Sequence, residues 1–126
     1  MNLIVLSIII LIESSGNPLA YNVHSQARGL CQITPICLQE YNNFHKGKEW
    51  TLDEMFEPEK NKAVASWYLN ERIPQMIRHY KKEVTVENCL IAYNAGIKYV
   101  AEGRRLPRET EDYIKKYKRL VNQDKR

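Results

Sequence analysis

Residues 3–18 read LIVLSIIILIESSGNP, and this stretch decides how the rest of the chain is interpreted. Its first ten residues carry no charge, and they are too few for a bilayer-spanning helix, which needs about 20 residues. A signal peptide has an apolar core of this length, but a positively charged segment should precede it, and only Met1 and Asn2 do. A helix buried on all sides of a small domain is the third interpretation, and the pattern would suit a strand equally well.

The chain has 126 residues and the composition of a globular protein, with 44% hydrophobic and 27% charged residues. This composition excludes a disordered or fibrous chain, and the length predicts one domain covering residues 1–126. Nineteen basic against 15 acidic residues give a net charge of +4, which favours an anionic partner without specifying it. A nucleic-acid partner is not predicted, because no recognition-helix pattern or basic-aromatic motif accompanies the charge.

Apolar residues recur at helical spacing along the chain, which predicts an all-α domain of about five or more helices. Pro58 suits a helix start, Pro74 should end or kink that helix, and Thr85 is placed to cap the next one. Gly96 is expected just beyond the end of that next helix. The polar residues 122–126 of the tail 121–126 are expected to fray. The patterns place helices at about 3–12, 36–41, 51–56, 58–82, 85–95 and 113–121, with a loop around Gly103 and Pro107.

The three cysteines, Cys31, Cys37 and Cys89, fit buried small hydrophobic residues better than a metal site. Cys31 and Cys37 are six positions apart, unlike the closely spaced pair of a zinc knuckle or redox motif, and the histidines are isolated. Neither a metal nor a cofactor is therefore predicted. A disulfide between Cys31 and Cys37 stays open for an exported protein.

Glu13 is the first charged residue after the apolar run. A carboxylate at the end of an apolar helix is expected to be poorly solvated, which raises its pKa toward the range of a general acid near neutral pH. On spacing alone, a plainer alternative is favoured, in which Glu13 is only the first exposed residue after a buried helix.

Three further clusters carry polar residues that an ordinary helical bundle does not need. Gln32 is polar within an apolar segment, so it requires a partner or a ligand. Tyr93 and Asn94 stand at a glycine-ended helix terminus, where a ring and an amide suit a sugar-binding groove, although helix capping explains them too. Tyr113 follows a charged segment. Its plainer interpretation is a core residue after a charged helix start.

Together and in this order, the clusters resemble the catalytic domain of soluble lytic transglycosylases, the goose-lysozyme-like family that cleaves bacterial peptidoglycan. Glu-Ser-Ser-Gly-Asn-Pro at 13–18 is similar to the first family motif, with Glu13 at the position of the catalytic acid. The match extends over residues 3–120. The segments that resemble the second motif, the helix after it, and the third and fourth motifs are 27–33, 56–61 with 68–69, 92–96 and 109–113.

This resemblance favours a core helix for the opening run, because a signal peptidase cut near Ser15 would remove Glu13 itself. The sequence also departs from the family pattern. Cys31 and Thr34 stand where methionine is common in the family, and the helix that usually precedes the first motif is not seen here. We expect these departures to alter groove packing and to lower stability.

The resemblance implies a lysozyme-like fold and cleavage of the β-1,4 bond between N-acetylmuramic acid and N-acetylglucosamine, giving a 1,6-anhydromuramoyl end. Hydrolases of either stereochemistry normally use two carboxylates, and no second carboxylate with a matching motif is found, so Glu13 is expected to act as the single general acid and base. A lysozyme-type muramidase and a non-catalytic wall-binding or assembly protein remain alternatives. The residues expected to line the groove are Gln32, Tyr93, Asn94 and Tyr113, with Ser25 as a weaker candidate.

Peptidoglycan glycan strands are the partner that this resemblance implies, at an extracytoplasmic or phage-virion location without a convincing signal peptide. Small enzymes of this type serve wall-spanning secretion or conjugation systems or phage assemblies. No membrane span is predicted. Cationic residues of the last helix are expected to contact the anionic wall, namely Lys115, Lys116, Lys118 and Arg119.

Overall fold

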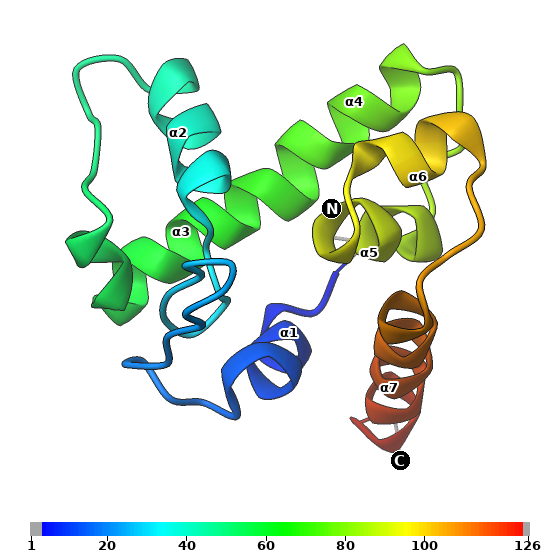
Figure 1. Cartoon of the computed structure of the whole chain (residues 1–126), viewed down its shortest axis with the longest axis horizontal. Helices are drawn as coiled ribbons and strands as arrows, with labels where there is room; N and C mark the ends of the chain where they lie inside the picture. Colours follow the sequence, from blue (N-terminus) through cyan, green and yellow to red (C-terminus); the bar gives the residue numbers. More distant parts are fainter. Residues whose placement is uncertain (1–3, 125–126) are drawn as a thin grey trace. The chain divides into compact units, whose positions relative to one another are not determined.

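The computed structural model describes residues 4–124. The regular structure of these residues is helical, which confirms the predicted all-α class (Figure 1). The chain divides into two compact units, one of residues 9–68 and one of residues 69–126 with 1–8. We refer to them as the 9–68 unit and the 69–124 unit, the second including the described residues 4–8.

Helix α1 covers Leu6–Ser14, so the apolar run forms a helix, as predicted. The expectation that this helix is buried on all sides was wrong. Ile8 and Ile9 are buried, whereas Leu11 is 51% exposed, and Val5, just before the helix, is 39% exposed. Val5 and Leu11 are left uncovered by the other described segments, so this side of the apolar run faces outward. Leu3, the first residue of the run, lies outside the described residues.

The 9–68 unit contains helix α2 (Pro35–Phe44), the 3₁₀ helix η1 (Asp53–Phe56) and helix α3 (Pro58–Trp67). Thr34 caps α2, because its side chain accepts a hydrogen bond from the Cys37 backbone N–H at 3.2 Å, and Pro35 occupies the first turn. These two signals start α2 one residue before the predicted 36–41, and the helix also runs three residues beyond it. Pro58 opens α3 as predicted.

An aromatic cluster closes the loop after α2 within the same unit. The Tyr41 ring stacks on His45 and Trp50 at centroid distances of 3.9 and 5.2 Å and meets Trp67 edge-on at 5.5 Å. The Asn42 side chain donates to the Trp50 carbonyl at 2.9 Å and accepts from its N–H at 3.0 Å. These contacts order a polar connection that has no helix of its own.

Pro74 was expected to end or kink the helix that begins at Pro58. It does not end the helix, because residues 58–79 are helical throughout. A π-helical turn, η2 (Tyr68–Arg72), lies immediately before α4 (Ile73–His79), and Pro74 stands in the first turn of α4. A proline gives no N–H to the preceding turn, and its ring crowds the carbonyl there. The wider π turn accommodates this disruption at the start of α4, where a proline is tolerated.

The 69–124 unit also contains α5 (Val86–Asn94), α6 (Ile97–Glu102) and α7 (Arg108–Asp124). Thr85 caps α5 by accepting from the Asn88 N–H at 3.0 Å, and Gly96 follows the helix with φ +111°, both as predicted. Helix α6 was not predicted, because six residues between two glycines are too few for a periodic pattern.

Helix α7 continues through Asp124, so residues 122–124 of the tail that was expected to fray are helical, and its last two residues lie outside the described part. Its buried face carries Tyr113, Ile114 and Tyr117, and the Tyr117 hydroxyl accepts from the Val5 backbone N–H at 2.9 Å. Helix α5 packs against α4, α6 and α7. The buried apolar side chains that these helices share include Leu69, Ile73, Ile77, Cys89, Leu90 and Val100.

Candidate functional site

Glu13 occupies the last turn of α1, and the chain reverses direction directly after it. Ser15 and Gly16 adopt left-handed conformations with φ +55° and +83°, which end the helix. The Ser14 hydroxyl donates to the Ile10 carbonyl at 3.1 Å and accepts from the Gly16 N–H at 3.2 Å. The Ser-Ser-Gly part of the motif therefore forms a helix end that fixes the position of the partly buried Glu13.

The charge of Glu13 acts on the Cys31 thiol within the 9–68 unit. Burial raises the pKa of Cys31 to about 12, the neighbouring Glu13 carboxylate adds to this rise, and Lys62 opposes it. Burial likewise raises the pKa of Cys37 to about 12. Cys31, Cys37 and Cys89 are all buried, as predicted for small hydrophobic residues, and none of them forms a disulfide within residues 4–124. Cys31 is therefore an uncharged thiol near neutral pH.

Gln32 lies at the end of a tight turn formed by residues 28–33. Arg28 and Ile33 exchange two backbone hydrogen bonds of 3.0 Å, and Gln32 itself is left-handed with φ +55°. The Gln32 amide nitrogen donates to the carbonyls of Gly29 and Ala20 at 3.1 and 3.3 Å. These bonds give the amide the partner that the sequence required and hold it against its own loop.

At Gly29 the backbone of this turn lies close to Met55 and Asn61. A Cβ atom at this position would lie 2.2 Å from the Met55 carbonyl oxygen and 2.4 Å from the Asn61 amide nitrogen, and the residue has φ +79°. Both the backbone conformation and the space therefore require glycine.

Asn61 of α3 is fully buried and forms hydrogen bonds with the turn of residues 28–33. Its amide nitrogen donates to the carbonyls of Arg28 and Met55 at 2.8 Å each, and its amide oxygen accepts from the Cys31 N–H at 2.9 Å. Asn61 lies in the segment 56–61 that resembles a family helix, and it was not among the predicted site residues. The available signal was a lone amide on the apolar face of a predicted helix, since such a group needs partners when buried.

Ser25 belongs to an exposed turn rather than to the turn that carries Gln32. Its hydroxyl accepts from the Ala27 N–H at 3.2 Å, and the Asn22 side chain accepts from the N–H groups of His24 and Ser25 at 2.9 and 3.1 Å. Ser25 is the weakest of the predicted groove residues.

Glu54, an acidic residue of η1 in the same unit, has a local structural role. Its side chain accepts hydrogen bonds from the Thr51 backbone N–H at 2.9 Å and from Lys60, while the Glu54 N–H donates to the Thr51 hydroxyl at 3.3 Å. This reciprocal arrangement is a capping box at the start of η1. The hydrogen bond from Lys60, followed by those from Thr51, lowers the Glu54 pKa, so this carboxylate stays ionised.

Asn94 and Thr110 are joined within the 69–124 unit. The Thr110 hydroxyl donates to the Asn94 side-chain oxygen at 2.8 Å, and Thr110 is 1% exposed in the first turn of α7. This bond joins the third and fourth motifs in one contact. Thr110 was quoted with the fourth motif but was not singled out, because a threonine in a charged first turn resembles ordinary capping chemistry.

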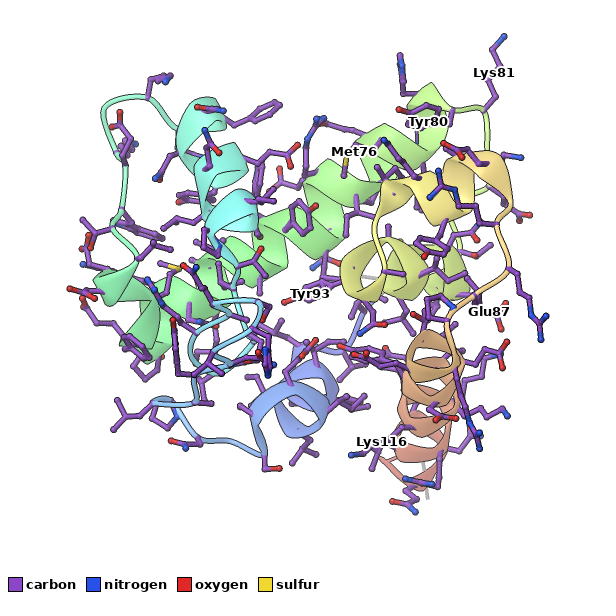
Figure 2. All side chains as sticks on the ribbon, viewed as in Figure 1. Met76, Tyr80, Lys81, Glu87, Tyr93 and Lys116 are labelled. Atoms are coloured by element: carbon purple, nitrogen blue, oxygen red, sulfur yellow. The ribbon has the colours of Figure 1, made fainter. Side chains whose placement is uncertain are left out.

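Tyr93 and Tyr113 belong to the same unit. Tyr93 is partly exposed on α5 beside Asn94 (Figure 2), whereas Tyr113, one helical turn after Thr110, is 7% exposed. Low exposure agrees with the core interpretation that the sequence left open for Tyr113. Of the predicted site residues, Glu13, Gln32 and Ser25 therefore belong to the 9–68 unit, and Tyr93, Asn94 and Tyr113 to the 69–124 unit.

The cationic residues of α7 are exposed, as a solvated face requires. Lys118 forms an ion pair with Glu87, and Lys116 extends outward from the helix (Figure 2). Residues 4–124 contain no helix long and apolar enough to cross a membrane. In the same part of the chain, no three His, Cys, Asp or Glu side chains are grouped as metal ligands.

The helical fold and the Glu-Ser-Ser-Gly-Asn-Pro helix end define a domain of the lysozyme-like class. The family model that matches this chain is the Transglycosylase SLT domain, over residues 2–116, and the chain therefore belongs to this family of lytic transglycosylases. No curated protein and no solved structure matches the chain significantly.

Proposed function

We propose that this protein, acting as one functional domain over residues 1–126, cleaves the β-1,4 bond between N-acetylmuramic acid and N-acetylglucosamine in peptidoglycan. The observation that carries the proposal is the position of Glu13, which ends the apolar helix within a chain of the SLT family. The helix end built by Ser14, Ser15 and Gly16 supports a fixed carboxylate. Proximity and orientation of this kind are what general acid catalysis needs.

In the proposed reaction, Glu13 first protonates the glycosidic oxygen that leaves. The N-acetyl group of the substrate stabilises the oxocarbenium-like centre at C1. Glu13, now a carboxylate, takes the proton from the C6 hydroxyl, and the C6 oxygen forms a bond to C1. The product is a 1,6-anhydromuramoyl end, no water is consumed, and Glu13 returns to its protonated form.

Gln32, Tyr93, Asn94 and Tyr113, with Ser25 as the weakest candidate, are proposed to bind or orient the glycan. The bonds of Gln32 to Gly29 and Ala20, and of Thr110 to Asn94, support ordered amides of the kind a sugar-binding site uses. The location is proposed to be extracytoplasmic or phage-associated, where peptidoglycan is accessible. A wall-spanning secretion, conjugation or phage assembly is the proposed setting.

Product analysis of purified peptidoglycan digested with the wild-type protein and Glu13→Gln tests this proposal. Wild type should release fragments with anhydro ends, which are lighter by one water than hydrolysis products. Glu13→Gln should lose at least about 100-fold in rate, the usual scale of a general acid contribution. Glu59→Gln is the matched control, because Glu59 is an exposed carboxylate paired with Lys62 on α3.

Three other results would each contradict the proposal. Fragments without anhydro ends would identify a lysozyme-type hydrolase. Tight binding to wall sacculi without any cleavage would identify a wall-binding or assembly protein. Retained activity in folded Glu13→Gln would remove Glu13 from the mechanism.

A further inference from the structure

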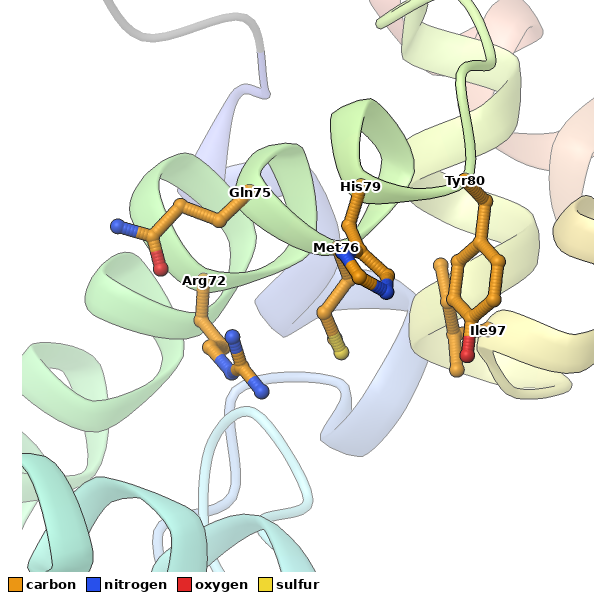
Figure 3. Close-up of a pocket in the computed structure, with 6 residues that line it drawn as sticks. All are labelled: Arg72, Gln75, Met76, His79, Tyr80 and Ile97. Carbon is orange, nitrogen blue, oxygen red and sulfur yellow. The ribbon is translucent and has the colours of Figure 1, made fainter.

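Three large apolar side chains are exposed within five residues of the 9–68 unit. Leu19 and Val23 are 70% and 71% exposed, and Tyr21 between them is 47% exposed. In the 69–124 unit Tyr80 is exposed as well, but it lines a hollow of about 370 Å³ together with Ile97 (Figure 3). Single exposed apolar residues are ordinary in proteins, whereas a group of them marks an interaction surface.

A short hairpin holds these three side chains in place. Two backbone hydrogen bonds of 2.9 and 3.0 Å join residues 19–23 to residues 27–29. These bonds set Tyr21 opposite Arg28 in an antiparallel bridge. Because the backbone is ordered before any partner arrives, binding costs less conformational entropy here than at a flexible loop. We refer to residues 19–23 as the exposed edge.

The backbone of Tyr21 is an open strand edge. The Ala20 carbonyl and the Asn22 N–H both bond toward residues 27–29. Successive residues of an extended strand direct their backbone groups to opposite sides, so the N–H and C=O groups of Tyr21 point away from the hairpin. Neither group forms a hydrogen bond with any part of residues 4–124. Such an edge is a template for pairing with another extended chain.

Arg28 adds a charge next to this edge. Its guanidinium lies over the Tyr21 ring, with the Cζ atom 5.3 Å from the ring centroid. The Nε atom is buried and has no hydrogen-bond partner in the described part of the chain, and none of the ion pairs there includes Arg28. A guanidinium with unused donors favours a carboxylate, which accepts two parallel N–H bonds. The exposed edge therefore favours an acidic partner.

These observations select one kind of occupant. A second copy would bring two Arg28 guanidinium groups and two chains of net charge +4 together, and like charges disfavour that pairing. A lipid surface would leave the Tyr21 N–H and C=O groups without partners in hydrocarbon. We infer that the exposed edge binds an extended segment of a partner protein, which adds to it as a strand and carries apolar residues at alternate positions and a carboxylate. This inference does not depend on the proposed catalytic function.

Nuclear magnetic resonance titration of the nitrogen-15-labelled full chain tests the inference. The probe is the peptide acetyl-Val-Thr-Glu-Thr-Val-amide, in which the central glutamate is meant to lie opposite Tyr21. The backbone amide signals of Tyr21 and Val23 should shift, and hydrogen exchange at the Tyr21 N–H should slow. A peptide with glutamine at the centre should bind about 3- to 10-fold more weakly, because it loses the charge-assisted bonds to Arg28. An N-methylated central glutamate should weaken binding about 2- to 10-fold, because one strand hydrogen bond is lost.

Variants of the protein locate the two interactions. Arg28→Gln should reduce the affinity for the glutamate peptide to that for the glutamine peptide, as expected if the two groups are coupled. Arg104→Gln is the matched control and should leave binding unchanged, because Arg104 also lies over a tyrosine ring, that of Tyr99 at 5.7 Å, but belongs to the other unit and pairs with Glu102. Val23→Ser should weaken both peptides without changing the thermal unfolding midpoint, since Val23 is exposed.

Four results would overturn the inference. The first is the absence of any shift at Tyr21 and Val23 in the folded wild-type chain at peptide concentrations up to about 10 mM. The second is equal affinity for the glutamate and glutamine peptides. The third is a dimer in sedimentation equilibrium that Val23→Ser dissociates, which would assign the exposed edge to a second copy. The fourth is binding to phosphatidylglycerol vesicles that Val23→Ser abolishes, without binding of the peptide.

Discussion

Replacement of Gly29 by alanine tests the claim that the turn carrying Gln32 is built by a close approach of three segments. The new Cβ would lie 2.2 Å from the Met55 carbonyl oxygen and 2.4 Å from the Asn61 amide nitrogen. Neither atom can move freely, because Met55 is buried in η1 and Asn61 is fully buried between its hydrogen-bond partners. The substitution must therefore displace the turn or break its contacts.

The expected loss of stability has two parts. Placing alanine at φ +79° costs about 1–2 kcal/mol, because a Cβ is unfavourable in the left-handed region. Displacing Asn61 weakens its three hydrogen bonds with Arg28, Met55 and Cys31, and each buried polar group left unsatisfied costs about 1–3 kcal/mol. The free energy of unfolding should therefore fall by about 3–5 kcal/mol, which is large for one methyl group.

Urea unfolding monitored by tryptophan fluorescence measures this loss, with Gly47→Ala as the matched control. Gly47 has φ +85°, yet a Cβ there meets nothing within 4 Å, so only the backbone cost of about 1–2 kcal/mol should appear. The difference between the two variants isolates the close approach. If Gly29→Ala loses no more stability than Gly47→Ala, the packing argument for this turn is refuted.

Three further predictions concern the stability of the fold and depend on Thr110, Thr85 and Cys31. Thr110→Val should lower the free energy of unfolding by about 1 kcal/mol in urea titrations, because Asn94 loses its 2.8 Å hydrogen bond, and Thr110→Ser should retain most of it. Thr85→Ala should cost about 1 kcal/mol through loss of the α5 cap, whereas Thr85→Ser should be nearly neutral. The Cys31 pKa rises from 9.0 to about 12 on folding, so the buried neutral thiol stabilises the fold fully below pH 9, and this contribution is lost as pH rises toward 12. The free energy of unfolding should therefore decline over this pH range, and an equally steep decline in Cys31→Ala would contradict this.

Local chemistry in the sequence predicted the helix ends better than it predicted burial. Each correctly predicted helix end depends on one residue that acts locally. Pro58 and Gly96 act through their backbone preferences, and Thr85 acts through its side-chain cap. The exposure of Leu11 depends on how much of the rest of the chain reaches it, which no local pattern records. The π turn before Pro74 is likewise a compromise between a proline and the packing around it.

The candidate site divides in the same way. Glu13 and the amide of Gln32 were recognisable, because a charge ending an apolar run and an amide inside one are local anomalies. The pairing of Thr110 with Asn94 was not, because it joins positions 16 apart through a fold that spacing alone does not give. Asn61 reaches Arg28 and Cys31 across about 30 positions, so its role also required the tertiary structure.

In the segments 13–18 and 27–33, many residues are required by the backbone geometry rather than by catalytic chemistry. Ser15 and Gln32 are non-glycine residues with φ +55°, a conformation held only where surrounding contacts favour it. Gly29 and Asn61 supply those contacts around Gln32 without any chemical group suited to bond cleavage. A chain that lost catalysis but kept this fold would retain the same glycine, serine and asparagine residues. Motif similarity alone therefore does not separate an enzyme from a wall-binding protein, whereas the products formed by wild type and Glu13→Gln do.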